Sequence, residues 1–98
     1  MSSKMTSKHA LIRLLTQEEG GRFSDPLPNY HVQVEVGNIF TSCVVHPVPN
    51  IDIIARGQNI EVMLAFTFYE HVKDVLDQMV DFEMYEGSKK IGNGKFIE

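Results

Sequence analysis

The sequence lacks tryptophan, long hydrophobic runs and any second cysteine. Its single cysteine, Cys43, cannot form an internal disulfide, so nothing indicates an oxidising compartment and we expect a cytoplasmic protein. No apolar run approaches the ~20 residues of a membrane-spanning helix. The N-terminal letters MSSKMTSK also lack the apolar stretch of a secretion signal. These absences predict a soluble protein without a membrane partner.

An excess of positive charge is missing as well. Nine Lys and Arg residues against 13 Asp and Glu residues give a net charge of −4, the wrong sign for a surface that attracts phosphate backbones as a whole. With 98 residues, 43% of them hydrophobic and 22% charged, the chain has the size and composition of one small globular domain. Nucleic-acid binding would therefore need a local basic patch.

Alternating apolar and polar residues, the pattern of strands with one buried face, recur along most of the chain. Residues 8–98 are expected to form one domain, after a flexible segment at residues 1–7. Strands are predicted at residues 9–16, 30–36, 39–45, 60–68, 80–85 and 91–97, with a further short segment at 51–54. The predicted interior consists of Val32, Val34, Val36, Val62, Leu64, Phe66, Val80 and Phe82. Short strands separated by turn residues predict an antiparallel barrel or sandwich.

Four short motifs stand in order along the chain. Glu18–Arg22 reads EEGGR, Asn29–Gln33 reads NYHVQ, Arg56–Val62 reads RGQNIEV and Glu86–Gly94 reads EGSKKIGNG. Their order and spacing resemble the C-terminal domain of elongation factor Tu, where these places read EEGGR, GYRPQ, PGDNVE and EGGRTVGAG. The resemblance covers residues 10–98. It implies an all-β fold, a closed antiparallel barrel of six strands, without the GTPase domain and the second barrel of that factor.

The same resemblance implies positions for RNA contacts. In the family this barrel helps to hold the T stem of aminoacyl-tRNA, and the corresponding residues here are Gln33, Ser42, Glu86 and Gly87. Lys89 and Lys90 follow them and belong to the main basic concentration of the sequence. They could meet phosphates, or form a charged strand edge that discourages aggregation. The chain departs from the family at Phe68, which stands where the family has a basic or histidine residue.

Catalysis, nucleotide binding and metal binding are not expected. Gly92–Lys95 is followed by Phe96 and lacks the spacing and the strand-loop-helix context of a phosphate-binding loop, so no nucleotide is expected. Cys43 and His46 are three residues apart in a predicted strand and should lie on opposite faces, which argues against a metal site. Asp81 and Glu83 share a strand face with no nucleophile beside them. The sequence predicts neither an enzyme nor a cofactor.

Two functions remain open. The first is a non-catalytic binding module whose ligand is a protein or a second copy of the chain, with residues 68–79 as its interface. The residues expected to form that interface are Phe68, Tyr69, Val72 and Leu76. Val72, Val75 and Leu76 also have helical spacing, which equally fits one or two helical turns packed on the core. The second function is weak tRNA binding related to translation, which the net charge and Phe68 disfavour.

Overall fold

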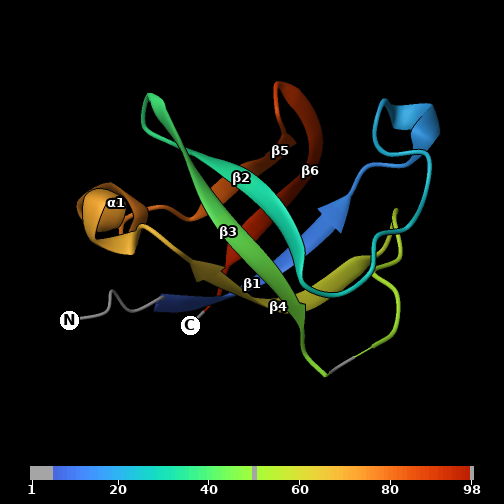
Figure 1. Cartoon of the computed structure of the whole chain (residues 1–98), viewed down its shortest axis with the longest axis horizontal. Coiled ribbons are helices and arrows are strands. Elements are labelled where there is room, and N and C mark those ends of the chain that lie inside the picture. The colour runs from blue at the N-terminus through green and yellow to red at the C-terminus, as the bar shows by residue number, and fades with distance from the viewer. Residues whose placement is uncertain (1–5, 50, 98) are drawn as a thin grey trace.

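Six antiparallel strands curl into a closed barrel in the computed structural model, which describes residues 6–49 and 51–97 (Figure 1). The strands are β1 (Thr6–Leu14), β2 (Tyr30–Val36), β3 (Ile39–Pro47), β4 (Asn59–Phe66), β5 (Asp81–Glu86) and β6 (Lys89–Phe96). Around the barrel they follow the order β1-β4-β3-β2-β5-β6, and β6 returns to pair with β1. The alternation predicted an antiparallel barrel or sandwich, and the closed six-stranded antiparallel barrel that the resemblance implied is confirmed.

The barrel interior is filled by the apolar residues of the alternating strands. Val34, Val62, Leu64 and Phe66 are completely or almost completely buried, as predicted. Val80 was expected beside Phe82 in this interior, and that prediction is wrong because Val80 is exposed. It lies in a bend before β5 begins at Asp81, so the inward-outward alternation of the strand does not extend to it.

Two other expectations differ in detail from the described chain. Residues 51–54 do not form a strand, yet Ile54 is fully buried and its backbone N–H donates to the carbonyl of Pro26 over 2.8 Å. The expected flexible segment, residues 1–7, falls mostly outside the described residues, and β1 already begins at Thr6. The apolar residues of segment 51–54 therefore indicated burial, which Ile54 shows, but they did not indicate the backbone conformation of the segment.

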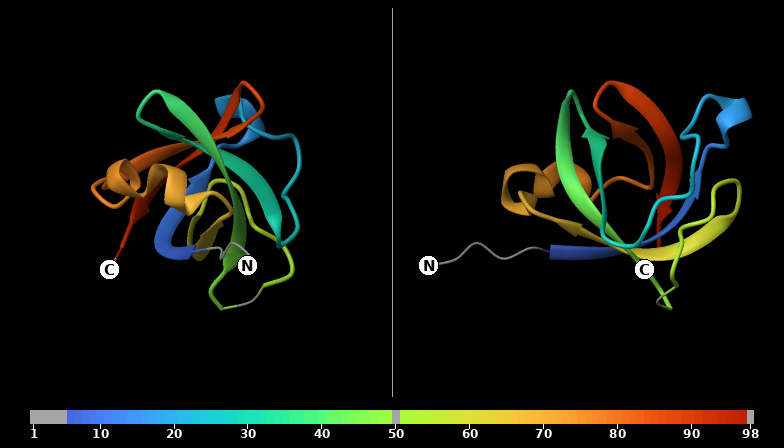
Figure 2. Two further views of the ribbon diagram at one scale, coloured as in Figure 1. Left: turned by 60° about the vertical axis from the view of Figure 1, so that its left-hand side comes forward. Right: turned by 45° about the vertical axis from the view of Figure 1, so that its right-hand side comes forward.

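A short connection (Gln17–Glu19, a 3-10 turn) follows β1, and one α-helix, α1 (Tyr69–Leu76), joins β4 to β5. Val72 and Leu76, one helical turn apart, are buried in the core cluster. The expectation that they form a partner interface is wrong, because the barrel itself covers them. Phe68 and Val75 remain exposed, while Tyr69 is half-buried and packs against the core. Figure 2 shows α1 beside the β2–β3 hairpin.

Hydrogen bonds fasten the end of α1 to the first strand. Lys8 Nζ donates to one oxygen of Asp77 over 2.6 Å, and the Tyr69 hydroxyl donates to the other over 2.6 Å. The Lys8 ammonium also lies 5.9 Å from the ring centroids of Tyr69 and Phe96. These contacts fix the helix, whose buried face supplies the apolar packing.

The seam between β2 and β5 is the shortest pairing among the described strands. Its register is limited to Gln33↔Tyr85 and Val34↔Met84. On the other side of β5, the β5–β6 pairing is irregular between Met84 and Tyr85, where Ile91 of β6 has no partner. An irregularity of this kind bends a strand and redirects its side chains, and such bulges are frequent next to functional sites. Polar side chains gather on the outer face of this seam.

Candidate binding site

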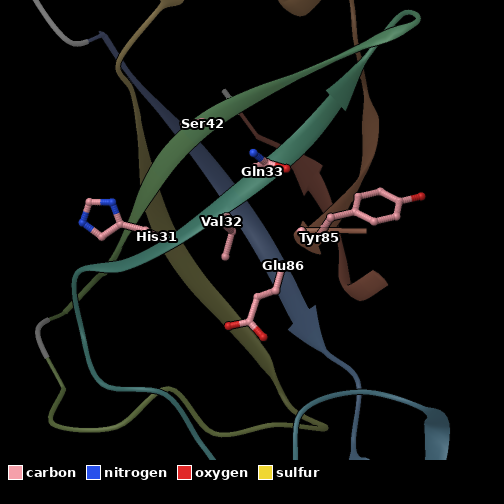
Figure 3. A pocket seen from close by; sticks show the side chains of 7 residues that line it. His31, Val32, Gln33, Ser42, Tyr85 and Glu86 are labelled. Carbon is pink, nitrogen blue, oxygen red and sulfur yellow. The ribbon is translucent and has the colours of Figure 1, made fainter. Parts of the chain in front are cut away.

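An open hollow of about 330 Å³ lies on the outer face of the barrel, over β2, β3 and β5 (Figure 3). It is lined by His31, Val32, Gln33, Ser42, Tyr85, Glu86 and Gly87. The four residues that the elongation factor resemblance assigned to RNA contacts, at positions 33, 42, 86 and 87, are all among them. Lys89 and Lys90 do not line the hollow but follow it on the same hairpin.

Strand register brings these distant residues together. Gln33 faces outward because its neighbours Val32 and Val34 are buried, and it pairs with Ser42 of β3 on one side. On the other side it pairs with Tyr85 of β5. Gly87 occupies the turn after β5 with φ of +60°, a left-handed conformation that a residue with a Cβ rarely adopts. The hollow thus lies over three neighbouring strands, with a tight turn at one end.

The charge of Glu86 is compensated by an arginine from a distant loop. Arg22 Nη1 donates to Glu86 Oε2 over 2.5 Å, and Arg22 Nε donates to the carbonyl of Ser24 over 3.2 Å. The Arg22 guanidinium also lies 5.0 Å from the centroid of the Tyr30 ring. Sequence analysis did not assign Arg22 to the site, although it stands in the EEGGR motif. Glu86 therefore presents a carboxylate that is already partly neutralised.

Tyr30 lies beneath this ion pair with its hydroxyl buried. Among the described residues the hydroxyl has no hydrogen-bond partner. Burial raises the pKa of Tyr30 above its ordinary value, and the nearby Glu86 carboxylate adds to the rise. Tyr30 therefore stays protonated and contributes an aromatic surface, rather than a charge, to the support of Arg22.

Two cations near the hollow, Arg22 and Lys90, are paired with carboxylates. Lys90 Nζ lies 3.3 Å from an oxygen of Glu83, whose other oxygen accepts a 2.8 Å hydrogen bond from the Tyr85 hydroxyl. The hydrogen bond from Tyr85 and the contact with Lys90 hold the pKa of Glu83 below its usual range. Further pairs elsewhere are Lys8–Asp77, Arg13–Glu19, Arg56–Asp25 and Lys73–Glu70. Of the expected basic concentration, Lys90 is paired with Glu83, whereas no ion pair engages Lys89 among the described residues.

The chain matches no protein-family model and no curated protein. The resemblance to the C-terminal domain of elongation factor Tu therefore remains a prediction that rests on its four motifs. Over residues 6–49 and 51–97, no three His, Cys, Asp or Glu side chains are grouped to hold a metal ion. No helix in that part of the chain is long and apolar enough to cross a membrane.

The hollow offers neutral hydrogen-bonding groups together with one compensated carboxylate. The amide of Gln33 donates and accepts, the Ser42 hydroxyl does the same, and Glu86 accepts. His31 adds an exposed imidazole at one edge, where Figure 3 shows it pointing away from Gln33 and Glu86. This set suits a ligand that presents hydroxyl and amino groups along an extended edge.

Proposed function

We propose that the protein is a non-catalytic RNA-binding module that holds one edge of a double-stranded stem, such as the T stem of a tRNA, in this hollow. The proposal is supported chiefly by one observation. Gln33, Ser42, Glu86 and Gly87, which come from three strands and a turn, line a single hollow. They are also the residues that the resemblance associates with T-stem contacts.

The chemistry of an RNA stem fits these groups. The minor groove of an A-form helix is wide and shallow and displays ribose 2′-hydroxyls and base edges. The amide of Gln33 and the hydroxyl of Ser42 can bond to 2′-hydroxyls, and the carboxylate of Glu86 can accept from hydroxyl or amino groups. An open hollow with outward polar side chains suits such a surface better than it suits a small apolar ligand, which needs an enclosed pocket.

The hypothesis of a protein ligand or a second copy bound through residues 68–79 has less support, because Val72 and Leu76 belong to the core.

The net negative charge of the chain should also weaken RNA binding. Since most cations around the hollow are paired with acids, few phosphates can be neutralised, and we expect weak binding. With one or two phosphate contacts, log K should fall with log salt with a slope of about −1 to −2. Lys89, exposed beside the hollow, is the cation expected to contribute most.

Fluorescence anisotropy with a labelled T-arm RNA hairpin, and with a DNA hairpin of the same sequence, tests the proposal. We expect the RNA to bind more tightly than the DNA, because DNA lacks the 2′-hydroxyl. Gln33→Ala should weaken RNA binding about fivefold or more, the loss that corresponds to one hydrogen bond of about 1 kcal/mol. Gln58→Ala is the matched control, because Gln58 is exposed and does not line the hollow.

The outcome separates RNA from other ligands. Equal binding of the two hairpins, equal effects of the two glutamine variants, or no RNA binding at low salt would each contradict the proposal. A protein ligand would instead be indicated if Gln33→Ala abolished capture of a defined protein while RNA did not bind.

A further inference from the structure

Two aromatic side chains contact each other at the edge of the hollow. Tyr85 lines the hollow from β5, and Figure 3 shows it at the edge opposite His31. Phe40 of β3 packs against it, with ring centroids 5.1 Å apart and ring planes at 86° to each other. In this T-shaped arrangement the edge of one ring meets a face of the other. Phe40 therefore keeps at least one ring face that Tyr85 does not cover.

Strand alternation places Phe40 on the same outer surface as the hollow. Its neighbour Thr41 is buried, so Phe40 points outward like Ser42, which lines the hollow two residues further along β3. Two residues along a strand span roughly 7 Å. Phe40 is 49% exposed, although burial of an aromatic ring is favourable. An uncovered flat ring thus continues the row of outward side chains that lines the hollow.

Tyr85, which supports the Phe40 ring, is itself held at both ends. Its backbone pairs with Gln33 of β2, and its hydroxyl donates to Glu83 over 2.8 Å. Glu83 is in turn held by Lys90, whose Nζ lies 3.3 Å from its other oxygen. A ring that is already positioned loses little conformational entropy when a ligand stacks on it.

A carboxylate without an ion-pair partner lies beside Phe40. Glu35 of β2 is directly opposite Phe40 in the strand register, and it points outward because its neighbours on both sides in the strand are buried. Among the described residues no ion pair engages Glu35. The hydrogen bond to Glu83 raises the pKa of Tyr85, and the charge of Glu35 adds to the rise, which places this carboxylate near the aromatic pair.

We propose that Phe40 stacks on an unpaired nucleobase beside the RNA stem held in the hollow, and that Glu35 accepts a hydrogen bond from an exocyclic amino group of that base. The inference rests on the RNA-binding function proposed above. Unpaired bases are commonly recognised by stacking on aromatic side chains. Adenine, cytosine and guanine carry an exocyclic amino group and uracil does not. The ligand is therefore a stem with an adjoining unpaired nucleotide other than uridine.

The charge of Glu35 favours a base over an apolar protein side chain as the group that covers Phe40. An apolar side chain in this position would remove water from the carboxylate without supplying a hydrogen-bond donor, which is costly. A base with an amino group supplies the donor and covers the ring with an uncharged face. Stacking also needs no cation, so it is compatible with the ion pairs near the hollow.

RNA duplexes with and without a single overhanging nucleotide test this inference on the full chain. Fluorescence anisotropy compares a blunt duplex of T-stem sequence with duplexes that carry an overhanging adenosine, uridine or abasic ribose at the 5′ or the 3′ end. We expect adenosine at one of the two ends to tighten binding about fivefold or more, because the base stacks on Phe40. The abasic residue should bind like the blunt duplex, and uridine should give a smaller gain than adenosine.

Substitutions separate the aromatic ring from the stem-binding groups. Phe40→Ala should lose the gain from the adenosine overhang, whereas Phe40→Trp keeps an aromatic face and should retain it. Glu35→Ala should reduce the preference for adenosine over uridine. Gln33→Ala should weaken the blunt and the overhanging duplexes alike, because it acts on the stem. Phe68→Ala is the matched control and should retain the gain, since Phe68 is 53% exposed but does not line the hollow.

The outcomes distinguish this inference from the RNA-binding proposal. A blunt duplex that binds without any gain from an overhang, or a gain that survives in Phe40→Ala, would overturn the stacking inference alone. Equal gains from adenosine and uridine would overturn the role of Glu35. If no duplex binds, an NMR titration with a single-stranded adenosine hexamer decides: shifted Phe40 ring signals would support stacking and contradict stem binding, and unchanged signals would overturn both.

Discussion

Among the glycines, Gly94 of β6 leaves the least space for a Cβ, because Phe82 of β5 packs directly against it. A Cβ built on Gly94 would come within 2.1 Å of Phe82 Cζ, so the ring occupies the space that any side chain would need. The same ring lies 4.5 Å, centroid to centroid, from Phe96. The packing of Phe82 therefore requires glycine at position 94.

Gly94→Ala should therefore lower the free energy of unfolding by about 1–3 kcal/mol, the usual cost of overpacking. Urea denaturation measures the change, and Asn93→Ala on the exposed face is the control, expected within about 0.5 kcal/mol of wild type. Adding Phe82→Leu to Gly94→Ala should cost less than the two single effects combined, because the smaller side chain frees the space. Strictly additive effects would show that the ring and the glycine do not compete for it.

The carboxylate of Glu19 accepts several hydrogen bonds near the 3-10 turn, and these should make the stability of the protein depend on pH. Its carboxylate accepts from Arg13 Nη1 over 3.1 Å and Nη2 over 3.0 Å, and from the Thr16 N–H over 2.9 Å. The Thr16 hydroxyl in turn accepts from the Glu19 N–H, which completes a capping box on the 3-10 turn. The hydrogen bonds from Arg13, and then that from Thr16, lower the pKa of Glu19 to about 2.

Because the pKa of Glu19 is lower in the folded state, its stabilising contribution is present above its unfolded value of 4.5 and is lost as the pH falls toward 2. Unfolding free energies measured between pH 6 and pH 2 should therefore fall less steeply in Glu19→Gln than in wild type. The exposed neighbour Glu18→Gln should retain the wild-type slope. An NMR titration that places the Glu19 carboxyl near 4.5 would contradict this account.

At the scale of elements, α1 shows how one helix can divide its apolar residues between core and solvent. Val72 and Leu76 point into the barrel, whereas Val75, adjacent in sequence to Leu76, is about half exposed. Helical spacing alone identifies an apolar stripe but does not say whether the same chain covers it. The barrel covers that stripe here, which the sequence could not reveal.

Leu76→Ala should destabilise the protein by about 2–5 kcal/mol, as for other buried leucines, and could prevent folding of so small a domain. Val75→Ala should change stability by less than about 0.5 kcal/mol. Thermal and urea unfolding of the two variants give the comparison, and Leu76→Met, with its similar volume, keeps a folded variant available. Similar losses of stability in Leu76→Ala and Val75→Ala would contradict the burial of Leu76 in the core.

Strand alternation predicted the elements well where one face is buried and the other is polar. It failed at Val80 because a bend precedes β5, and at residues 51–54 because a buried Ile54 also occurs in an irregular loop. Apolar residues report burial, whereas hydrogen bonding to a neighbouring strand decides whether a segment is a strand. That neighbour is not visible in a local sequence window.

At the scale of the whole molecule, the candidate site depends on strand order. Gln33 and Glu86 stand in short motifs and Ser42 was assigned through the elongation factor resemblance, and the ring order of the barrel brings the three together. Their electrostatic partners were not identified, because Arg22 and Glu86 are 64 positions apart and their pairing depends on the loop path. The sequence therefore indicated the hydrogen-bonding groups of the site but not the neutralisation of its charges.

The short β2–β5 seam should be the first part of the closed barrel to open. Pairing of β1 with β4 runs from Thr6↔Phe66 to Arg13↔Asn59, in contrast to the limited register of the seam. In native-state hydrogen exchange, amides that point across the seam should exchange faster than those between β1 and β4. RNA bound in the hollow should slow the seam amides selectively. Equal protection at both pairings would show that the barrel opens only as a whole.

The pairing of β6 with β1, from Ala10↔Phe96 to Leu14↔Gly92, also affects how the protein can be made. A ribosome releases the strands in chain order, so β1 and β5 each have an open edge until β6 has emerged. Unpaired strand edges are templates for aggregation. Strand β6, which closes the barrel, covers both edges at once, so a nascent chain that stalls before Lys89 would leave two edges with which neighbouring chains could pair.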